Sequence, residues 1–304
     1  MEQVMDSGVK QKKRKLFRSR DDKMMFAMLA PAVIAVFVIS IVPLVYTFYL
    51  SFHNYILTKP QEISFFGFGN FIRVFSDSAI LESIRNTLIF TVCSVSISLV
   101  VGVALASLIN NVTRGKTFFR IVIFTPMMFS AVVVGVIWRF LFNNEMGILN
   151  YLVQCLGFSR INWLGDAKMA MVSAIIADVW QWSSYTFILA LAAMEAMDPE
   201  PIEAATVDGA SAVQIFFRIK FHALLPVLEV AAMFRFIWAF RSFDLIYALT
   251  NGGPGTATET MALEVWRQAF TRYDVGVSSA ISVLMFLILT VLSIAILKNS
   301  MKSD

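Results

Sequence analysis

The sequence predicts an all-α, polytopic membrane protein with about six transmembrane helices and both termini in the cytoplasm. Of its 304 residues, 58% are hydrophobic and only 15% are charged, which is far from the balance of soluble proteins. The hydrophobic residues fall in runs of roughly 20, the length that a helix needs to cross a hydrocarbon core about 30 Å thick. Basic residues flank these runs unevenly, and that asymmetry predicts the orientation.

Six hydrophobic runs are the candidate spans. They lie near residues 24–52, 84–111, 118–143, 170–194, 224–250 and 276–299. The first run is longer than the ~7–15-residue apolar centre of a signal peptide, so we expect it to be a retained anchor. The chain therefore divides into a basic tail over residues 1–23, a transmembrane domain over residues 24–299 and a short tail over residues 300–304.

The orientation follows from the positive-inside rule, because Lys and Arg beside a span tend to stay in the cytoplasm. Placing the tail between Lys10 and Lys23 inside also places Arg114, Lys116 and Arg120 inside, and in total fifteen basic residues lie on that side against six outside. The same asymmetry explains the sequence pI of about 9.1, so we expect no nucleic-acid partner.

Local spacing favours no catalytic or metal site. Cys93, Cys155, His53 and His222 are isolated from one another in the sequence and form neither a metal-binding pair nor a disulfide framework. The segment starting at Gly115 superficially resembles the end of a phosphate-binding loop. That motif needs another glycine five residues earlier, where this chain has asparagine, so we expect no ATP site and no cofactor in this chain.

Polar residues at membrane depth mark a candidate solute pathway. Four of them share one face of the fourth span by helical spacing, and three form a stripe on the fifth: Asp178, Gln181, Trp182 and Tyr185, then Arg235, Trp238 and Ser242. Aromatic planes suit the C–H face of a sugar, and the charged and amide groups can satisfy its hydroxyls. The alternative is a buried Asp–Arg pair with aromatic residues that only fix helix packing.

A cytoplasmic loop over residues 198–222 predicts two short helices. Pro201 suits a first helical turn, and the pair that begins at Asp208 permits a reversal before a second helix over Ala212–Phe221. The second helix is amphipathic, because Val213 and Phe217 share a face by 3–4 spacing. Amphipathicity alone fits either a helix lying on lipid or one docked into a protein groove.

The residues of this loop resemble the EAA loop of binding-protein-dependent ABC importer permeases. The matching positions are Glu203, Ala204, Ala205, Asp208, Gly209, Ala210, Phe216, Ile219 and Pro226. Residues 243–254, 269–270, 279–282 and 178–182 are similar to the carbohydrate-uptake branch that contains the maltose and glycerol-phosphate permeases. One departure is His222, where the family often has proline, which puts the end of the second helix in question.

The resemblance implies a permease that moves a carbohydrate or related polar solute by alternating access. The loop would dock into a separate ATPase subunit, with Glu203 as the main polar contact, Gly209 at the turn, and Phe216 and Ile219 on the apolar side. The implied partners are a second, homologous but distinct permease, two ATPase subunits that hold ATP and Mg, and an extracytoplasmic solute-binding protein. The implied location is the bacterial plasma (inner) membrane, in contact with lipid.

A gradient-driven secondary transporter or channel is the alternative function. It would also use about six spans and buried charges. Many such transporters have internal repeats, and the hydrophobic pattern of this sequence has no duplicated pair of interrupted spans.

Overall fold

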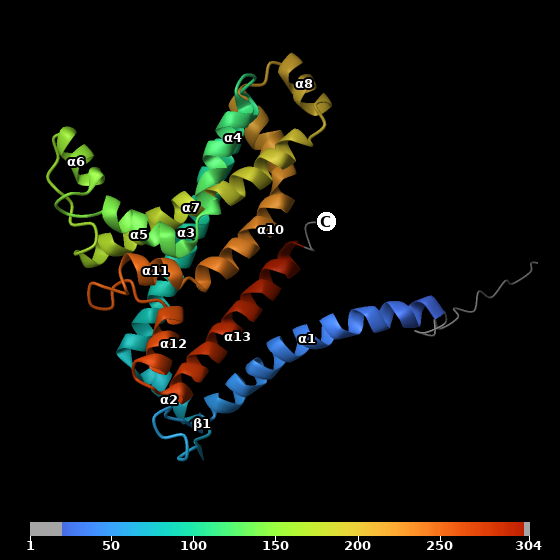
Figure 1. Ribbon diagram of the computed structural model, residues 1–304. Helices are drawn as coiled ribbons and strands as arrows, with labels where there is room; N and C mark the ends of the chain where they lie inside the picture. The colour runs from blue at the N-terminus through green and yellow to red at the C-terminus, as the bar shows by residue number, and fades with distance from the viewer. Residues whose placement is uncertain (1–19, 301–304) are drawn as a thin grey trace, which may run out of the picture. The chain divides into compact units, whose positions relative to one another are not determined.

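The computed structural model describes residues 20–300, so residues 1–19 and 301–304, most of the two predicted tails, lie outside the described residues (Figure 1). The chain forms two compact units, one ending at Thr47 and the other beginning at Phe48. The first unit holds most of helix α1, Arg20–Ser51. Pro43 lies inside this helix, and the hydroxyl of Thr47 donates to the carbonyl of Pro43, one turn earlier, at 2.9 Å.

The second unit is almost entirely helical. Its one sheet among the described residues is an antiparallel pair, in which His53 lies opposite Phe65. In chain order the elements are β1 (His53–Asn54), β2 (Ser64–Phe65), α2 (Gly69–Ser76), α3 (Ser78–Asn110), α4 (Lys116–Phe124), η1 (Thr125–Met128), α5 (Ala131–Leu141), α6 (Ile148–Cys155), α7 (Ala167–Glu195), α8 (Glu200–Val207), α9 (Ala212–Ile215), the π-helical turn η2 (Phe216–Lys220), α10 (Phe221–Phe240), α11 (Asp244–Leu249), α12 (Met261–Phe270) and α13 (Val275–Ser300).

The long helices α3 and α7 form the centre of this unit. Each begins at an aspartate cap: Asp77 accepts from the amide of Ala79 at 2.8 Å, and Asp166 accepts from the amides of the second and third residues that follow it. The two helices approach closely at Gly102, where an added Cβ would lie 2.5 Å from the Cβ of Thr186. Small residues of this kind let helix backbones meet in a membrane, where apolar burial gives little driving force.

Other helices pack on this pair and on one another. Helix α10 packs on both α3 and α7, α5 packs on α11, and α13 packs on α2 and α12. In Figure 1, α4 and α8 lie at one end of the second unit, whereas α2 and the β1–β2 pair lie at the other end. The candidate coupling loop and the candidate external connections are therefore at opposite ends.

The structure supports four membrane spans by length and hydropathy within the described residues, or five if the bent pair of α4–η1 and α5 counts as one span. Helix α7 corresponds to the fourth predicted span and has 29 residues, but it is not among the four. Many of its buried residues are polar, so hydropathy does not identify it as a span. The predicted number of six is therefore not reached on this measure.

Two predicted spans are not single straight helices. The run 118–143 is not one straight helix, because Lys116–Met128 and Ala131–Leu141 meet at 100°. Pro126 lies at the start of the 3-10 turn before this bend, and Ser130 caps the helix after it, with its hydroxyl accepting from a backbone amide at 3.4 Å. The run 224–250 is likewise broken, since α10 ends at Phe240 and the separate helix α11 follows.

Candidate functional site

The loop of residues 198–222 folds into two short helices joined by a tight turn. Helix α8 ends with Gly209 in the left-handed conformation, at φ +80°, and the amide of Ala210 donates to the carbonyl of Ala205 at 2.9 Å. This arrangement closes the helix in the manner of a glycine C-cap. The next helix begins with a capping box, in which Ser211 and Gln214 each accept a backbone amide of the other.

The second helix of the loop does not end where the family pattern suggests. Residues Ala212 to Phe240 form one continuous helical segment, which includes the π-helical turn at Phe216–Lys220. His222 therefore does not mark a break, and its ring lies 3.0 Å from the carbonyl of Phe217. The loop is joined rigidly to α10, since no flexible linker separates the two.

The predicted coupling residues differ in exposure. Glu203, Ala204, Asp208 and Gly209 are exposed, whereas Ala205, Ala210, Phe216 and Ile219 are half-buried. A cavity of about 400 Å³ lies between α8 and the second helix, and its lining includes Ala205, Asp208, Gly209, Ala210 and Ile219. Phe216 packs inward against a core cluster that contains Phe187 and Leu224, and the exposed aromatic ring beside it is Phe217, 58% exposed.

A second cavity, of about 360 Å³, lies where α7 meets the C-terminal end of α10. We call it the polar cavity; its lining residues are Ala131, Asp178, Gln181, Trp182, Trp238, Arg241, Ser242, Phe243, Asp244 and Leu245. Five of the seven predicted pathway residues line it: Asp178, Gln181, Trp182, Trp238 and Ser242. The rings of Trp182 and Trp238 lie 4.8 Å apart and form one aromatic wall.

The other two predicted residues lie behind that wall. Arg235 has no exposed side-chain surface; its Nη2 lies 2.5 Å from a carboxylate oxygen of Asp178, and its guanidinium lies 5.1 Å from the ring centre of Trp182. Tyr185 packs edge-on against Trp238 at 5.2 Å. The predicted Asp–Arg pair is confirmed, and Arg235 supports the cavity without lining it.

Several polar groups of the cavity retain hydrogen-bonding capacity. The amide nitrogen of Gln181 donates to the carbonyl of Phe129 at 2.8 Å, while its oxygen is buried without a partner among the described residues. Arg241 and Asp244 are exposed at the cavity, and no ion pair joins them within the described chain. A polar solute could supply the missing partners.

Sequence reasoning missed Ser98 as part of this site, and it interprets Arg241 and Asp244 as a local pair or as support for a gate. The hydroxyl of Ser98, on α3, accepts from Arg235 at 3.4 Å, a contact between residues 137 apart in the chain that helical spacing cannot predict. Arg241 and Asp244 were detectable, because they are two charges three residues apart at the end of an apolar run. Their spacing suggests a local pair, but the break between α10 and α11 separates them.

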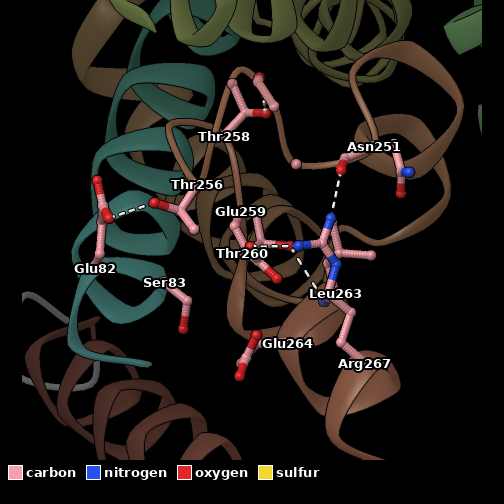
Figure 2. A network of polar contacts seen from close by, with 12 residues as sticks. Glu82, Ser83, Asn251, Thr256, Thr258, Glu259, Thr260, Leu263, Glu264 and Arg267 are labelled. Carbon is pink, nitrogen blue, oxygen red and sulfur yellow. Dashed lines mark hydrogen bonds and ion pairs between the residues drawn. The ribbon is translucent and has the colours of Figure 1, made fainter. Parts of the chain in front are cut away.

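A polar network fixes the connection between α11 and α12 (Figure 2). Arg267 donates to a carboxylate oxygen of Glu259 at 2.8 Å and to the carbonyl of Asn251 at 2.6 Å, and Thr256 donates to Glu82 of α3 at 2.5 Å. Burial is the main cause that raises the pKa of Glu259 to about 7, and the neighbouring carboxyl of Glu264 adds to the effect.

Comparisons with known proteins agree on one family. Residues 98–302, more than half of the chain, match the binding-protein-dependent transport system inner membrane component. The trehalose/maltose transport system permease protein MalF of Thermococcus litoralis is 35% identical over 282 residues, which cover 92% of this chain and 94% of that protein. The sulfoquinovosyl glycerol transport system permease protein SmoG of Agrobacterium fabrum is 33% identical over 259 residues, covering 85% and 84%.

Solved structures show the same fold. A bacterial ABC transporter involved in the import of the acidic polysaccharide alginate contains a chain that superposes with a TM-score of 0.81 at 21% identity, over 93% of this chain and 96% of that one. A complex of bacterial alginate ABC transporter with its alginate pentasaccharide-bound periplasmic protein gives 0.79 at 22% identity, over 91% and 93%. The gradient-driven alternative has no support from these matches. The chain belongs to the binding-protein-dependent transport system inner membrane components, and it is a multi-pass permease subunit of an ABC importer.

Proposed function

We propose that this permease moves a carbohydrate or a closely related polar solute through the polar cavity. The observation that carries the proposal is the combination of an aromatic wall, Trp182 and Trp238, with the unpartnered amide oxygen of Gln181. A sugar ring presents an apolar C–H face to an aromatic plane, and its hydroxyls can satisfy the amide oxygen and the exposed charges. Relatives whose names include trehalose, maltose and sulfoquinovosyl glycerol make this class of solute a consistent choice.

The energy for transport comes from ATP hydrolysis on separate subunits. In this proposal the chain itself has no ATP site and no cofactor, and two ATPase subunits hold ATP and Mg. The turn at Gly209 and the exposed carboxylate of Glu203 fit a loop that docks into such a subunit. Because the loop continues into α10 without a linker, movement of the loop would be transmitted to the helix that carries Arg235 and Trp238.

The full assembly contains a second, homologous but distinct permease and an extracytoplasmic solute-binding protein. Both termini of this chain lie in the cytoplasm, and the loop of residues 198–222 faces the ATPase subunits. The test uses variants without native cysteines, in which a single cysteine replaces either Lys59 or Val207. A reagent that does not cross the membrane of sealed vesicles should label the two positions from opposite sides. Labelling of both from the same side would refute this orientation.

Reconstituted uptake tests the function. The complete transporter in vesicles should take up solute with ATP and without an ion gradient. Trp238→Ala should lower uptake at sub-saturating solute by roughly tenfold, since an aromatic contact and its buried area contribute about 1–2 kcal/mol. Tyr151→Ala, at an exposed aromatic residue of α6 outside the polar cavity, is the matched control and should leave uptake unchanged. Uptake that follows a gradient without ATP would contradict the proposal.

Coupling has a separate test. Replacing Glu203 and Gly209 together, as Glu203→Ala and Gly209→Val, should leave membrane insertion intact and abolish solute-stimulated ATP hydrolysis. A branched residue at Gly209 strains a backbone that requires positive φ, although no atom lies within 4 Å of the added Cβ. Normal stimulation in the double variant would refute the coupling role.

A further inference from the structure

An apolar groove runs between α4 and α7, on a surface that neither the polar cavity nor the coupling loop uses. It encloses about 290 Å³, and its apolar lining consists of Ile121, Phe124, Phe187, Ile188, Leu191 and Ala192. The hydroxyl of Ser184 on α7 donates to the carbonyl of Ile123 on α4 at 2.5 Å, so the two walls are held together. From Phe187 to Glu195 the groove follows α7 for about 12 Å.

One end of the groove carries a cluster of charges. Lys116 Nζ lies 2.5 Å from Oε1 of Glu195, and Arg120 also pairs with that oxygen. The cluster therefore holds two cations against one carboxylate, and Arg114 adds an exposed cation just before α4. The Nε of Arg120 is buried and has no hydrogen-bond partner among the described residues.

The two ends of the groove require different chemistry from a single ligand. The surplus positive charge and the unpartnered N–H of Arg120 call for an anion, whereas the remaining lining is apolar. A free phosphate would leave the groove unfilled, and an apolar peptide would leave the cations uncompensated. A lipid with an anionic headgroup satisfies both requirements, and basic pockets between membrane helices on the cytoplasmic side are suited to such headgroups.

We propose that the α4–α7 groove binds one anionic phospholipid of the cytoplasmic leaflet. Its phosphate lies against Arg120 and Lys116, and one acyl chain lies along the groove toward Phe124. The site is independent of the transported solute and goes beyond the proposed function. It also differs from general lipid contact, because it selects the headgroup by charge.

The test uses the purified complete transporter in nanodiscs with equal amounts of phosphatidylglycerol and phosphatidylcholine, and native mass spectrometry counts the lipids retained. The wild-type transporter should retain more phosphatidylglycerol than phosphatidylcholine. Arg120→Gln should lower that retention roughly fivefold, the factor for about 1 kcal/mol per cation. Lys59→Gln removes an exposed external cation and is the matched control.

Glu195→Gln separates lipid binding from simple loss of structure. It breaks the same ion pairs as the loss of Arg120 and Lys116, but it removes the only carboxylate that competes with the phosphate within the cluster. Retention of phosphatidylglycerol should therefore rise in Glu195→Gln and fall in Arg120→Gln. A fall in both variants would mean that the charges only hold α4 to α7, and it would overturn the proposal.

Filling the groove tests the acyl-chain half of the site. Ala192 is exposed in the groove lining, so Ala192→Trp occupies the space without a change of charge. It should reduce retention as strongly as Arg120→Gln does. A photo-crosslinking residue at Ile188, which is 38% exposed, should form an adduct with lipid. An adduct with another polypeptide, or equal retention of both lipids by wild type, would refute the proposal.

Discussion

The buried pair of Asp178 and Arg235 gives the sharpest prediction about stability. Side-chain exposure is 0% for the arginine and 4% for the aspartate, and their closest atoms are 2.5 Å apart. Asp178→Ala leaves the guanidinium buried with a long contact to Ser98 and the face of Trp182 as its remaining contacts among the described residues. Breaking a buried pair from one side costs about 3–5 kcal/mol, because an uncompensated charge remains.

The measurement is thermal unfolding of the purified transporter in one detergent. A loss of 1 kcal/mol lowers the melting temperature by about 2–4 °C in chains of 150–250 residues, so Asp178→Ala should lower it by on the order of 10 °C. The double variant Asp178→Leu with Arg235→Met removes both charges and should recover most of that loss. Glu62→Gln is the control: it breaks the ion pair with Lys59, in which the Glu62 side chain is 69% exposed. It should change the free energy of unfolding by less than about 1 kcal/mol.

Two results would refute this reasoning. If Asp178→Ala has the same melting temperature as the wild type, the buried ion pair that the structure shows does not exist in the protein. If the double variant is as unstable as the single one, the loss arises from packing or from the cavity, and an unpaired charge is not its cause. A stable double variant that no longer transports would show that the pair also serves the pathway.

Three further predictions concern other parts of the chain. Because the pKa of Glu259 is raised to about 7 from 4.5, the folded protein holds a proton that the unfolded chain releases. The free energy of unfolding should therefore fall by at most about 3 kcal/mol between pH 4.5 and 7 and then level off, and Glu259→Gln should flatten that part of a melting-temperature profile. Gly102→Val should destabilise the α3–α7 contact by about 1–3 kcal/mol, whereas Ala104→Val, at an exposed site on the same helix, should not. Ser211→Ala removes a helix cap and should speed amide exchange at the start of α9, as about 1 kcal/mol of lost stability implies; unchanged exchange would contradict the cap.

Helical class and membrane location were predictable because they depend on averages over long runs of residues. The predicted spans differ from the structure at particular residues. Pro126 and the cap at Ser130 bend the third run by 100°, although most residues of the run are apolar. Helix α7 shows the opposite effect, because its buried polar residues lower its hydropathy while contacts with α3 and α10 keep it inside the protein. Hydropathy measures what lipid tolerates, and it does not record what neighbouring helices cover.

The candidate site was predictable where its residues lie on one helix. Asp178, Gln181 and Trp182 share a face by spacing alone, and all three line the polar cavity. The partner of Asp178 lies 57 residues away, so the pairing rested on an estimate of membrane depth for each charge. The role of Ser98 depends on where α3 crosses α10, which no local pattern encodes. Arg241 is visible as a charge at the end of an apolar run, but its place at the cavity depends on where α10 ends.

The continuity between the loop and α10 has a mechanical consequence for coupling. A helix transmits a push along its axis with little loss, and about 29 residues from Ala212 to Phe240 form one segment here. The π-helical turn at Phe216–Lys220 and Pro226 inside α10 are two irregular points of this segment, and Phe216 in the turn is packed into the core cluster with Phe187. In the proposed coupling, displacement of the loop would act on this packed point, and α10 would respond by tilting. Because Arg235 is bound to Asp178 of α7, the tilt must either carry α7 along or break a buried ion pair. Since breaking the pair costs several kcal/mol, the proposed coupling predicts that α7 and α10 move together and displace the polar cavity between them as one body.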